Sequence, residues 1–337
     1  MESDVTGFLL PRQSKALCAN GLNHELRPQI RIMNSRKQAP NSEFSSRSTA
    51  EEVTAGLNLS GKTILITGCN SGLGLESMRV LSARGAHCIA AARSKSKAEQ
   101  AAREVGGDIT AVACELSDLD SVATCADEIH SMGQPIDVLM CNAGIMALPE
   151  LQQKYGLEMQ FLTNHLGHFV LVNRLLDRVR QAPAGRVVMV SSLGHYTSVP
   201  GGINFDNLSG EKNYVPFTFY GQSKLANLLM SNELSRRLED STASSNAIHP
   251  GIIHTPLMRN IGDLRAMISK VVSWPFSRSV ERGAATQCYV ATAPELEGVS
   301  GHYFADCNPA RKSAHGRNPE LASRLWQVSE ELAADYL

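Results

Sequence analysis

The sequence contains no two cysteines with the CxxC spacing, although eight of its 337 residues are cysteine. Disulfide frameworks and zinc sites usually draw on closely spaced cysteines, whereas these are scattered and several lie in apolar runs. Cys141, for example, follows the run Asp137-Val138-Leu139-Met140. We therefore expect buried, reduced thiols, as in proteins of a cytosolic compartment.

The chain also lacks an excess of charge of either sign, with 32 basic residues, 33 acidic residues and a net charge of −1. A general nucleic-acid-binding surface would shift this balance toward basic residues, so no nucleic-acid partner is expected. No apolar run approaches the roughly 20 residues that a membrane-spanning helix needs. Residues 266–276 (AMISKVVSWPF) are apolar enough for peripheral contact with a membrane, and they could equally cover a substrate pocket.

A set of metal ligands is lacking as well. His165 and His168 stand three residues apart, and His249 and His254 share one predicted loop. No cysteine or carboxylate stands at a companion spacing typical of a metal site, so no metal is predicted.

The first 55 residues differ from the rest in composition. They are rich in Ser, Asn and Arg and lack sustained periodicity, so we predict a poorly ordered extension over 1–55 and a single domain over 56–337. An organelle-targeting segment is the alternative, because basic residues recur between positions 12 and 37. Against it stand Glu2 and Asp4, since targeting peptides are normally poor in acid. A cytoplasmic location is therefore expected, and organelle targeting by residues 1–55 stays open.

From Gly61 onward, short apolar runs alternate with longer amphipathic stretches. The apolar runs predict strands at 62–67, 87–92, 109–114, 136–141, 186–191, a weaker strand ending at 249, and 301–305. The longer stretches predict helices at 74–84, 96–105, after 117, at 160–179 and at 220–238. This alternation indicates βαβ units and a parallel sheet covered on both faces. We predict an α/β fold with a Rossmann-type doubly wound parallel sheet in a single domain.

The first predicted strand runs directly into a glycine-rich segment, Gly68-Cys69-Asn70-Ser71-Gly72-Leu73-Gly74. A helix follows it, and the N-terminus of a helix offers free N–H donors and a partial positive charge to a phosphate. Glycine permits a tight turn at position 68, a close approach to a pyrophosphate at 72 and close packing of helix on strand at 74. A connector without a ligand and a methyltransferase-type nucleotide fold are the alternatives for this segment alone.

The end of the second strand bears on the choice of cofactor. NAD-binding Rossmann folds usually place an acid there, about 20 residues after the glycines, to hold the ribose 2′-hydroxyl. Here the strand ends with Ala92-Arg93, and the first acid after it is Glu99. The charge and forked donors of an arginine suit the 2′-phosphate of NADP. We predict NADP(H), with NAD(H) less favoured; a solvated arginine at a strand end is the alternative.

Candidate acid–base residues occur on the last long helix and on the strand before it. Tyr220 and Lys224 stand four apart and therefore share one face of the helix, where the ammonium is expected to lower the pKa of the phenol. The fifth strand ends with Ser191-Ser192, at the carboxyl edge of the sheet where ligands of such folds bind. A serine there can donate to a substrate oxygen. Taken singly, YxxxK is more often an ordinary helix surface pair and a strand-end serine more often a cap.

In their order, these segments resemble motifs of the short-chain dehydrogenase/reductase family. Thr67 with the glycines that follow resembles its TGxxxGxG segment, Asn142-Ala143-Gly144 its NAG motif, and Tyr220 and Lys224 its YxxxK pair. The stretch 195–217 and the run Asn164-His165-Leu166-Gly167-His168-Phe169 resemble the retinol dehydrogenase and WW-domain oxidoreductase branch. The resemblance covers residues from about Leu57 to Ala305.

The resemblance implies roles for single residues. Ser192 rather than Ser191 matches the catalytic serine, and Asn164 matches an asparagine that holds a water in a proton relay; a plain helix asparagine is the alternative. Further residues are implied to contact the cofactor: Tyr220, Lys224, Glu115, Leu116, Asn142, Ala143, Gly144, Ile253 and Thr255. Glu115 departs from the aspartate usual in the family and is one methylene longer, which weakens the predicted contact with adenine.

The resulting hypothesis is an NADP(H)-dependent oxidoreductase that interconverts a carbonyl and an alcohol, with Tyr220 as proton donor and acceptor. Apolar residues between 254 and 280, such as Leu257, Met267 and Trp274, suggest a lipophilic small-molecule substrate. A catalytically silent cofactor sensor or scaffold with the same fold is the alternative. Family members are commonly dimers or tetramers, so a homo-oligomer also stays open.

Overall fold

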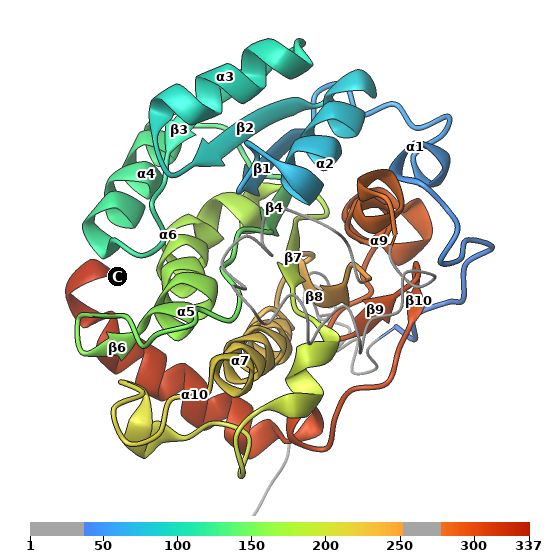
Figure 1. Cartoon of the computed structure of the whole chain (residues 1–337). Coiled ribbons are helices and arrows are strands. Elements are labelled where there is room, and N and C mark those ends of the chain that lie inside the picture. Colours follow the sequence, from blue (N-terminus) through green and yellow to red (C-terminus); the bar gives the residue numbers. More distant parts are fainter. Residues whose placement is uncertain (1–36, 252–277) are drawn as a thin grey trace, which may run out of the picture. The chain divides into compact units, whose positions relative to one another are not determined.

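The computed structural model describes residues 37–251 and 278–337. These residues form one eight-stranded sheet with helices around it (Figure 1). Its strands are β1 (Thr63–Thr67), β2 (His87–Ala92), β3 (Ile109–Ala113), β4 (Val138–Cys141), β7 (Arg186–Val190), β8 (Ser244–His249), β9 (Tyr303–Ala305) and β10 (Asn308–Pro309). They lie in the order β10-β9-β8-β7-β4-β1-β2-β3, and only β10 runs antiparallel to its neighbour. The predicted α/β fold with a doubly wound parallel sheet is confirmed, and the described residues 37–251 and 278–337 belong to one compact unit.

Helices cover both faces of this sheet. They are α1 (Ala50–Val53), α2 (Gly72–Ala83), α3 (Lys95–Val105), α4 (Leu119–Ser131), α5 (Met159–Phe161), α6 (Gly167–Gln181), α7 (Pro216–Arg237), α9 (Val280–Thr292) and α10 (Pro319–Leu332). Figure 1 shows α4, α6, α7 and α10 on one side of the sheet and α1, α2 and α9 on the other. A separate hairpin of β5 (Gln153–Lys154) and β6 (Leu157–Glu158) precedes α5.

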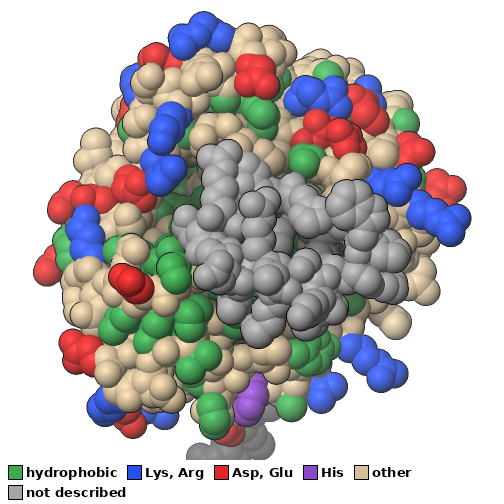
Figure 2. Space-filling view, in the orientation of Figure 1, with side chains coloured by type: hydrophobic (Ala, Val, Ile, Leu, Met, Phe, Trp, Pro, Cys, Tyr) green, Lys and Arg blue, Asp and Glu red, His purple; other side chains and the backbone are tan. Residues whose placement is uncertain are grey.

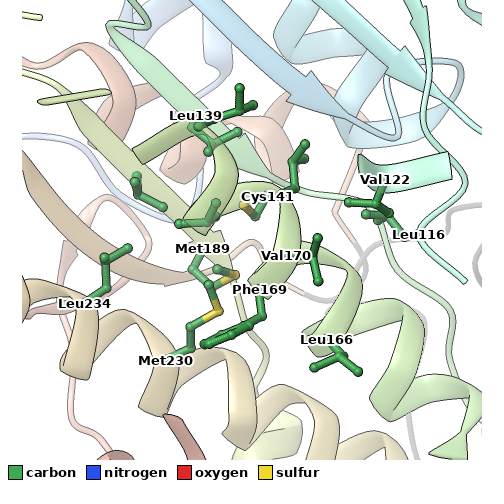
Figure 3. Close-up of a cluster of buried hydrophobic side chains, with 14 of the residues drawn as sticks. Leu116, Val122, Leu139, Cys141, Leu166, Phe169, Val170, Met189, Met230 and Leu234 are labelled. Carbon is green, nitrogen blue, oxygen red and sulfur yellow. The ribbon is translucent and has the colours of Figure 1, made fainter. Parts of the chain in front are cut away.

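Alternate residues of the strands point into two separate cores, because successive side chains of a strand leave opposite faces. Leu139 and Met189 pack with α4, α6, α7 and α10, whereas their neighbours Met140 and Val188 pack with α1, α2, α3 and α9. Figure 3 shows part of the first core, in which Phe169 of α6 lies near Met189 and Met230. Both faces of the central strands are therefore apolar, which explains their continuous hydrophobic runs.

One predicted helix is interrupted. The sequence predicted a single helix over 160–179, but α5 and α6 are separated by a π-helix at Leu162–Leu166. A π turn widens the helix by one residue and often occurs at functional sites. Here it carries Asn164, whose side chain is fully buried.

Strand β8 is unusually polar, which is why the sequence left its start in doubt. Two of its polar side chains find partners: the hydroxyls of Ser245 and Ser231 lie 3.0 Å apart, and the Asn246 side-chain amide donates to the carbonyl of Val299 at 2.7 Å. The amide of His302 in turn donates to Asn246 Oδ1 at 2.9 Å. Hydrogen bonds of this kind lower the cost of burying the polar side chains of Ser245 and Asn246.

The N-terminal boundary lies earlier than predicted. Residues 37–55, placed by sequence in a poorly ordered extension, pack on the fold: Lys37 Nζ donates to the carbonyl of Glu297 at 3.0 Å, and Ser42 Oγ to that of Cys307 at 2.9 Å. The Phe44 ring packs edge-on against Tyr289, with centroids 5.7 Å apart. In return, Asn308 Nδ2 of β10 donates to the Phe44 carbonyl at 2.8 Å, a long-range pairing that composition does not reveal. Residues 1–36 lie outside the described residues.

Among the described residues, no helix combines the length and apolar character that crossing a membrane requires. The segment 266–276, for which peripheral membrane contact was considered, lies outside the described residues. On the face shown in Figure 2, basic and acidic side chains are interspersed, in line with the balanced charge of the sequence.

The packing predicts that Phe169 is essential for the core beneath α6. Its side chain is fully buried and meets Trp326 edge-on, with ring centroids 4.9 Å apart. Phe169→Ala should lower the free energy of unfolding by about 3–5 kcal/mol, because it leaves a cavity. Leu332→Ala, at a side chain that is 37% exposed, is the control and should change it by no more than about 0.5 kcal/mol. Equal effects of the two substitutions in urea unfolding would contradict this packing.

Candidate active site

Two turns meet where the strand order reverses. β2 and β3 lie on one side of β1, and β4 lies on the other, so the turns that follow β1 and β4 are neighbours at the carboxyl edge. In open α/β sheets this switch point is where ligands bind. The Thr67 hydroxyl joins the turns by accepting hydrogen bonds from the amides of Asn142 and Ala143, both at 3.0 Å. Asn142 Nδ2 returns a bond to the Thr67 carbonyl at 2.8 Å.

The glycine-rich turn has a backbone conformation that depends on its glycines and leaves the N-terminus of α2 open. Gly68 and Gly72 have φ values of +69° and +56°, which residues with side chains rarely adopt. A Cβ on Gly74 would lie 2.3 Å from the Gly68 carbonyl oxygen, so α2 can pack this closely only with glycine there. Ser71 is exposed and its side chain does not cap α2, which leaves the first-turn amides available to a ligand.

Other residues of this segment differ in exposure. Asn70 and Leu73 are half-buried, whereas Cys69 is fully buried. Burial raises the pKa of the Cys69 thiol to about 12, so this cysteine is a packing residue and not a nucleophile.

The residues predicted to contact the adenosine end lie around the ends of β2 and β3. The Gly68 amide donates to the Ala91 carbonyl at 2.8 Å, and the exposed Arg93 follows two residues after Ala91. Glu115 accepts a hydrogen bond from the Ser117 hydroxyl at 2.9 Å. The side chain of Leu116 belongs to the core, and its carbonyl lies against Gly167.

Tyr220 lies between a serine and a lysine. Lys224 Nζ is 5.8 Å from the centroid of the Tyr220 ring and donates to the Val190 carbonyl at 3.1 Å. Ser192, in the turn after β7, lies beside Tyr220: a Cβ on Gly194 would lie 3.5 Å from Ser192 Oγ and 3.1 Å from Tyr220 Cε1. Ser191 points elsewhere, since its hydroxyl donates to the Lys224 carbonyl at 2.7 Å. The structure therefore separates the two serines that sequence alone left ambiguous.

The pKa of Tyr220 is not lowered as predicted from the nearby ammonium. Burial raises it to about 12, and the nearby Ser192 hydroxyl, which lowers the pKa, only partly opposes this. Burial also lowers the pKa of Lys224 to about 8. The reason is that loss of water disfavours both the phenolate and the ammonium, and at 5.8 Å from the ring centroid their attraction is the smaller effect.

Asn164 lies beneath the turn that follows β4. Its Oδ1 accepts from the Ile145 amide at 2.7 Å, and its Nδ2 donates to the Ile145 carbonyl and to Ser223 Oγ, both at 2.9 Å. A Cβ on Gly144 would lie 2.9 Å from Asn164 Oδ1 and 3.4 Å from Lys224 Nζ, so the turn after β4 backs directly onto these residues.

His168 completes this network and was not predicted. Its Nδ1 lies 2.9 Å from the Asn164 carbonyl, which can only accept, so Nδ1 carries the hydrogen. Its Nε2, 2.9 Å from Thr67 Oγ1, then accepts from that hydroxyl. Burial lowers the pKa of His168 to about 4, which keeps the ring neutral. The signal in the sequence was its i+4 spacing from Asn164. Its other partner, Thr67, could not be found this way because it lies 101 residues away in the sequence.

The structure therefore brings Asn164, Ser192, Tyr220 and Lys224 together beside the turns that contain Gly68–Gly74 and Asn142–Gly144. Ile253 and Thr255, predicted to hold the nicotinamide end, lie outside the described residues, as do Leu257, Met267 and Trp274. His165, considered as a metal ligand, is bonded to Ser329 Oγ at 2.8 Å instead.

This fold and this site define an oxidoreductase of the short-chain dehydrogenase family. The chain belongs to that family, whose model, described as short chain dehydrogenase, matches residues 62–265.

Similar proteins place it more closely. It is 39% identical over 307 residues to short-chain dehydrogenase TIC 32 B, chloroplastic, of Brassica napus, covering 88% of this chain and 96% of that protein. Retinol dehydrogenase 12 of Mus musculus is 38% identical, with 83% and 88% covered, and the WW domain-containing oxidoreductase of Gallus gallus is 38% identical, with 90% and 76% covered. A crystal structure of an uncharacterised Mycobacterium paratuberculosis protein superposes with a TM-score of 0.68 at 35% identity, covering 84% of this chain and 97% of that one. The resemblance to this branch is confirmed.

We expect the buried ammonium of Lys224 to destabilise the fold. Lys224 has a pKa of about 8 in the fold against an ordinary value of 10.5, so its charged form is disfavoured there. Below pH 8 the folded protein carries that penalty, and between pH 8 and 10.5 the unfolded chain binds more protons, so the free energy of unfolding rises with pH. Lys224→Met should therefore raise it at pH 7 by on the order of 1–3 kcal/mol.

Urea unfolding of both proteins at pH 7 and pH 9.5 tests this expectation. The difference between them should shrink at the higher pH. A variant that is less stable at pH 7, or a difference that does not change with pH, would show that the lysine is not an unfavourably buried charge.

Proposed function

We propose that the chain is an NADP(H)-dependent oxidoreductase that interconverts a carbonyl and an alcohol on a lipophilic small molecule. The observation that carries the proposal is the position of the Tyr220 phenol, between Ser192 and Lys224 at the carboxyl edge of the sheet. Carbonyl reduction is the proposed working direction.

The residues present fit a nicotinamide dinucleotide. The uncapped N-terminus of α2, which begins at Gly72, suits a pyrophosphate, and the exposed Arg93 suits a 2′-phosphate. Asn70, Ser71, Leu73, Glu115, Leu116 and Ala143 remain proposed contacts, together with Tyr220 and Lys224. When bound, the cofactor supplies or accepts a hydride.

Tyr220 and Ser192 would act on the substrate oxygen. In reduction, the phenol gives its proton to that oxygen, and a pKa of about 12 keeps the phenol protonated at neutral pH. The Gly194 amide donates to Ser192 Oγ at 3.1 Å, so the hydroxyl hydrogen of Ser192 stays free to donate. Ser192 therefore orients the oxygen and stabilises its negative charge.

Lys224 and Asn164 would support the proton transfer. The Lys224 ammonium sits below the phenol and hydrogen-bonds the ribose. The Asn164 side chain is already hydrogen-bonded to Ile145 and Ser223. The proposed relay water would therefore donate to the remaining lone pair of Asn164 Oδ1.

A lipophilic substrate is supported by exposed apolar side chains beside the turn. Leu193, which follows Ser192, is 48% exposed, and Tyr196 is 51% exposed. Large apolar side chains left exposed at the mouth of a site favour apolar ligands. One relative is named a retinol dehydrogenase, which makes retinoids one candidate among lipophilic aldehydes, ketones and alcohols.

A panel of aldehydes and ketones tests the proposed reaction. The protein should oxidise NADPH with at least one lipophilic carbonyl, and Tyr220→Phe should lower kcat by at least about 100-fold, because the proton donor is lost. Tyr155→Phe, at an exposed tyrosine in the β5–β6 hairpin, is the matched control and should be unaffected. Binding of NADPH without tyrosine-dependent turnover would instead support a cofactor sensor or scaffold.

Cofactor preference gives a second test. Arg93→Ala should raise KM for NADPH by about 10- to 100-fold, as expected for loss of charge-assisted hydrogen bonds to a phosphate, and leave KM for NADH nearly unchanged. Arg103→Ala, an exposed arginine near the end of α3, controls for the general loss of one positive charge. Equal changes for both cofactors would exclude Arg93 as the 2′-phosphate ligand.

We keep a cytoplasmic location as the proposal. The relative named chloroplastic makes organelle targeting by residues 1–55 its specific alternative. A homo-oligomer and peripheral contact of 266–276 with a membrane remain proposals of the same kind.

A further inference from the structure

The turn that carries Ser192 is held by a buried histidine. His195 lies in the 3-10 helix Leu193–Thr197, its side chain is fully buried, and its Nδ1 lies 2.6 Å from the Ser192 carbonyl oxygen. The backbone amide of His195 donates to the same oxygen at 3.1 Å. Two donors therefore converge on the carbonyl of the residue whose hydroxyl faces Tyr220.

The tautomer of His195 follows from its second partner. The Ser313 amide donates to His195 Nε2 at 3.1 Å, so Nε2 is the acceptor and the ring hydrogen lies on Nδ1. Nδ1 therefore donates to Ser192. Burial lowers the pKa of the ring, which favours this neutral form.

The same turn is bound to the C-terminal segment at a second point. The Tyr196 hydroxyl donates to the Arg311 carbonyl at 2.8 Å, two residues before Ser313. This segment is itself fixed to α7, because Asn232 Nδ2 donates to the Gly316 carbonyl at 2.8 Å. It lies beyond the residues 62–265 that the family model matches.

The turn also sets the space around the phenol. A Cβ on Gly194 would lie 3.1 Å from Cε1 of Tyr220, so a small shift of this turn moves Ser192 relative to the ring. The Ser192 hydroxyl is fixed on one side by the Gly194 amide and on the other by the backbone that His195 holds.

We propose that His195 is a positioning residue, which orients Ser192 toward the Tyr220 phenol and couples this turn to the C-terminal segment around Ser313. The inference rests on the proposed function for the role of Ser192. His195 acts on the reaction only through Ser192. The consequence is that the hydrogen bond from His195 Nδ1 to the Ser192 carbonyl aligns the catalytic serine, whereas the bond to Ser313 contributes to stability.

Two substitutions separate the bonds of the ring. His195→Asn places an amide donor near the Nδ1 position and loses the acceptor for Ser313, whereas His195→Gln reaches the Nε2 position and loses the donor to Ser192. Each variant lacks one hydrogen bond, so both should lower Tm similarly. The control is His315→Asn, in the same C-terminal segment, where the ring packs against Gly202 instead.

Steady-state reduction with NADPH should then distinguish the variants. His195→Gln should lower kcat by about 10- to 100-fold with KM for NADPH unchanged, as expected for a displaced catalytic group. His195→Asn should stay close to wild type, and so should His315→Asn. Equal losses for the Asn and Gln variants, or losses that follow Tm, would overturn the proposal.

A readout without turnover keeps the inference separate from the proposed function. The 13Cζ resonance of Tyr220, assigned by its absence in Tyr220→Phe, should shift in His195→Gln and not in His195→Asn. If the wild type reduces no carbonyl, the proposed function fails, and this resonance alone decides the inference. An unchanged resonance in His195→Gln would overturn it.

Discussion

The site depends on one hydroxyl, that of Thr67. It accepts hydrogen bonds from the Asn142 and Ala143 amides and donates to His168, which in turn donates to the Asn164 carbonyl. Through these bonds the ends of β1 and β4 and the π-helix between α5 and α6 are fixed as one unit. Because each of these groups has a hydrogen-bond partner, the geometry at the switch point is rigid before any ligand binds. This rigidity is what a phosphate cradle and a proton donor placed on different strands require.

The second constraint is burial of the acid–base pair. Loss of water raises the pKa of Tyr220 to about 12 and lowers that of Lys224 to about 8, because burial disfavours the charged form of each group. The buried Lys224 ammonium, although it is bound to the Val190 carbonyl, lowers the stability of the fold. Such unfavourable burial is characteristic of functional sites, and here it affects the two residues that the family motif marks.

Much of this could be predicted because the signals are local. The turn after β1, the order of strands and helices, and the face shared by Tyr220 and Lys224 follow from short spacings. The direction of the Tyr220 pKa was wrong, because burial depends on the whole fold. The interrupted helix around Asn164 and the polar start of β8 also depend on partners far along the chain. His195 was unforeseen for the same reason, since its partner Ser313 lies more than a hundred residues away.

The central claim is that the glycine-rich turn and Tyr220 border one dinucleotide site. A crystal structure of the protein grown with NADP+ tests it most directly. The account predicts the pyrophosphate at the N-terminus of α2, the 2′-phosphate at Arg93, and the nicotinamide ribose beside Tyr220 and Lys224. A dinucleotide bound elsewhere, or a Tyr220 side chain turned away from it, would contradict the account.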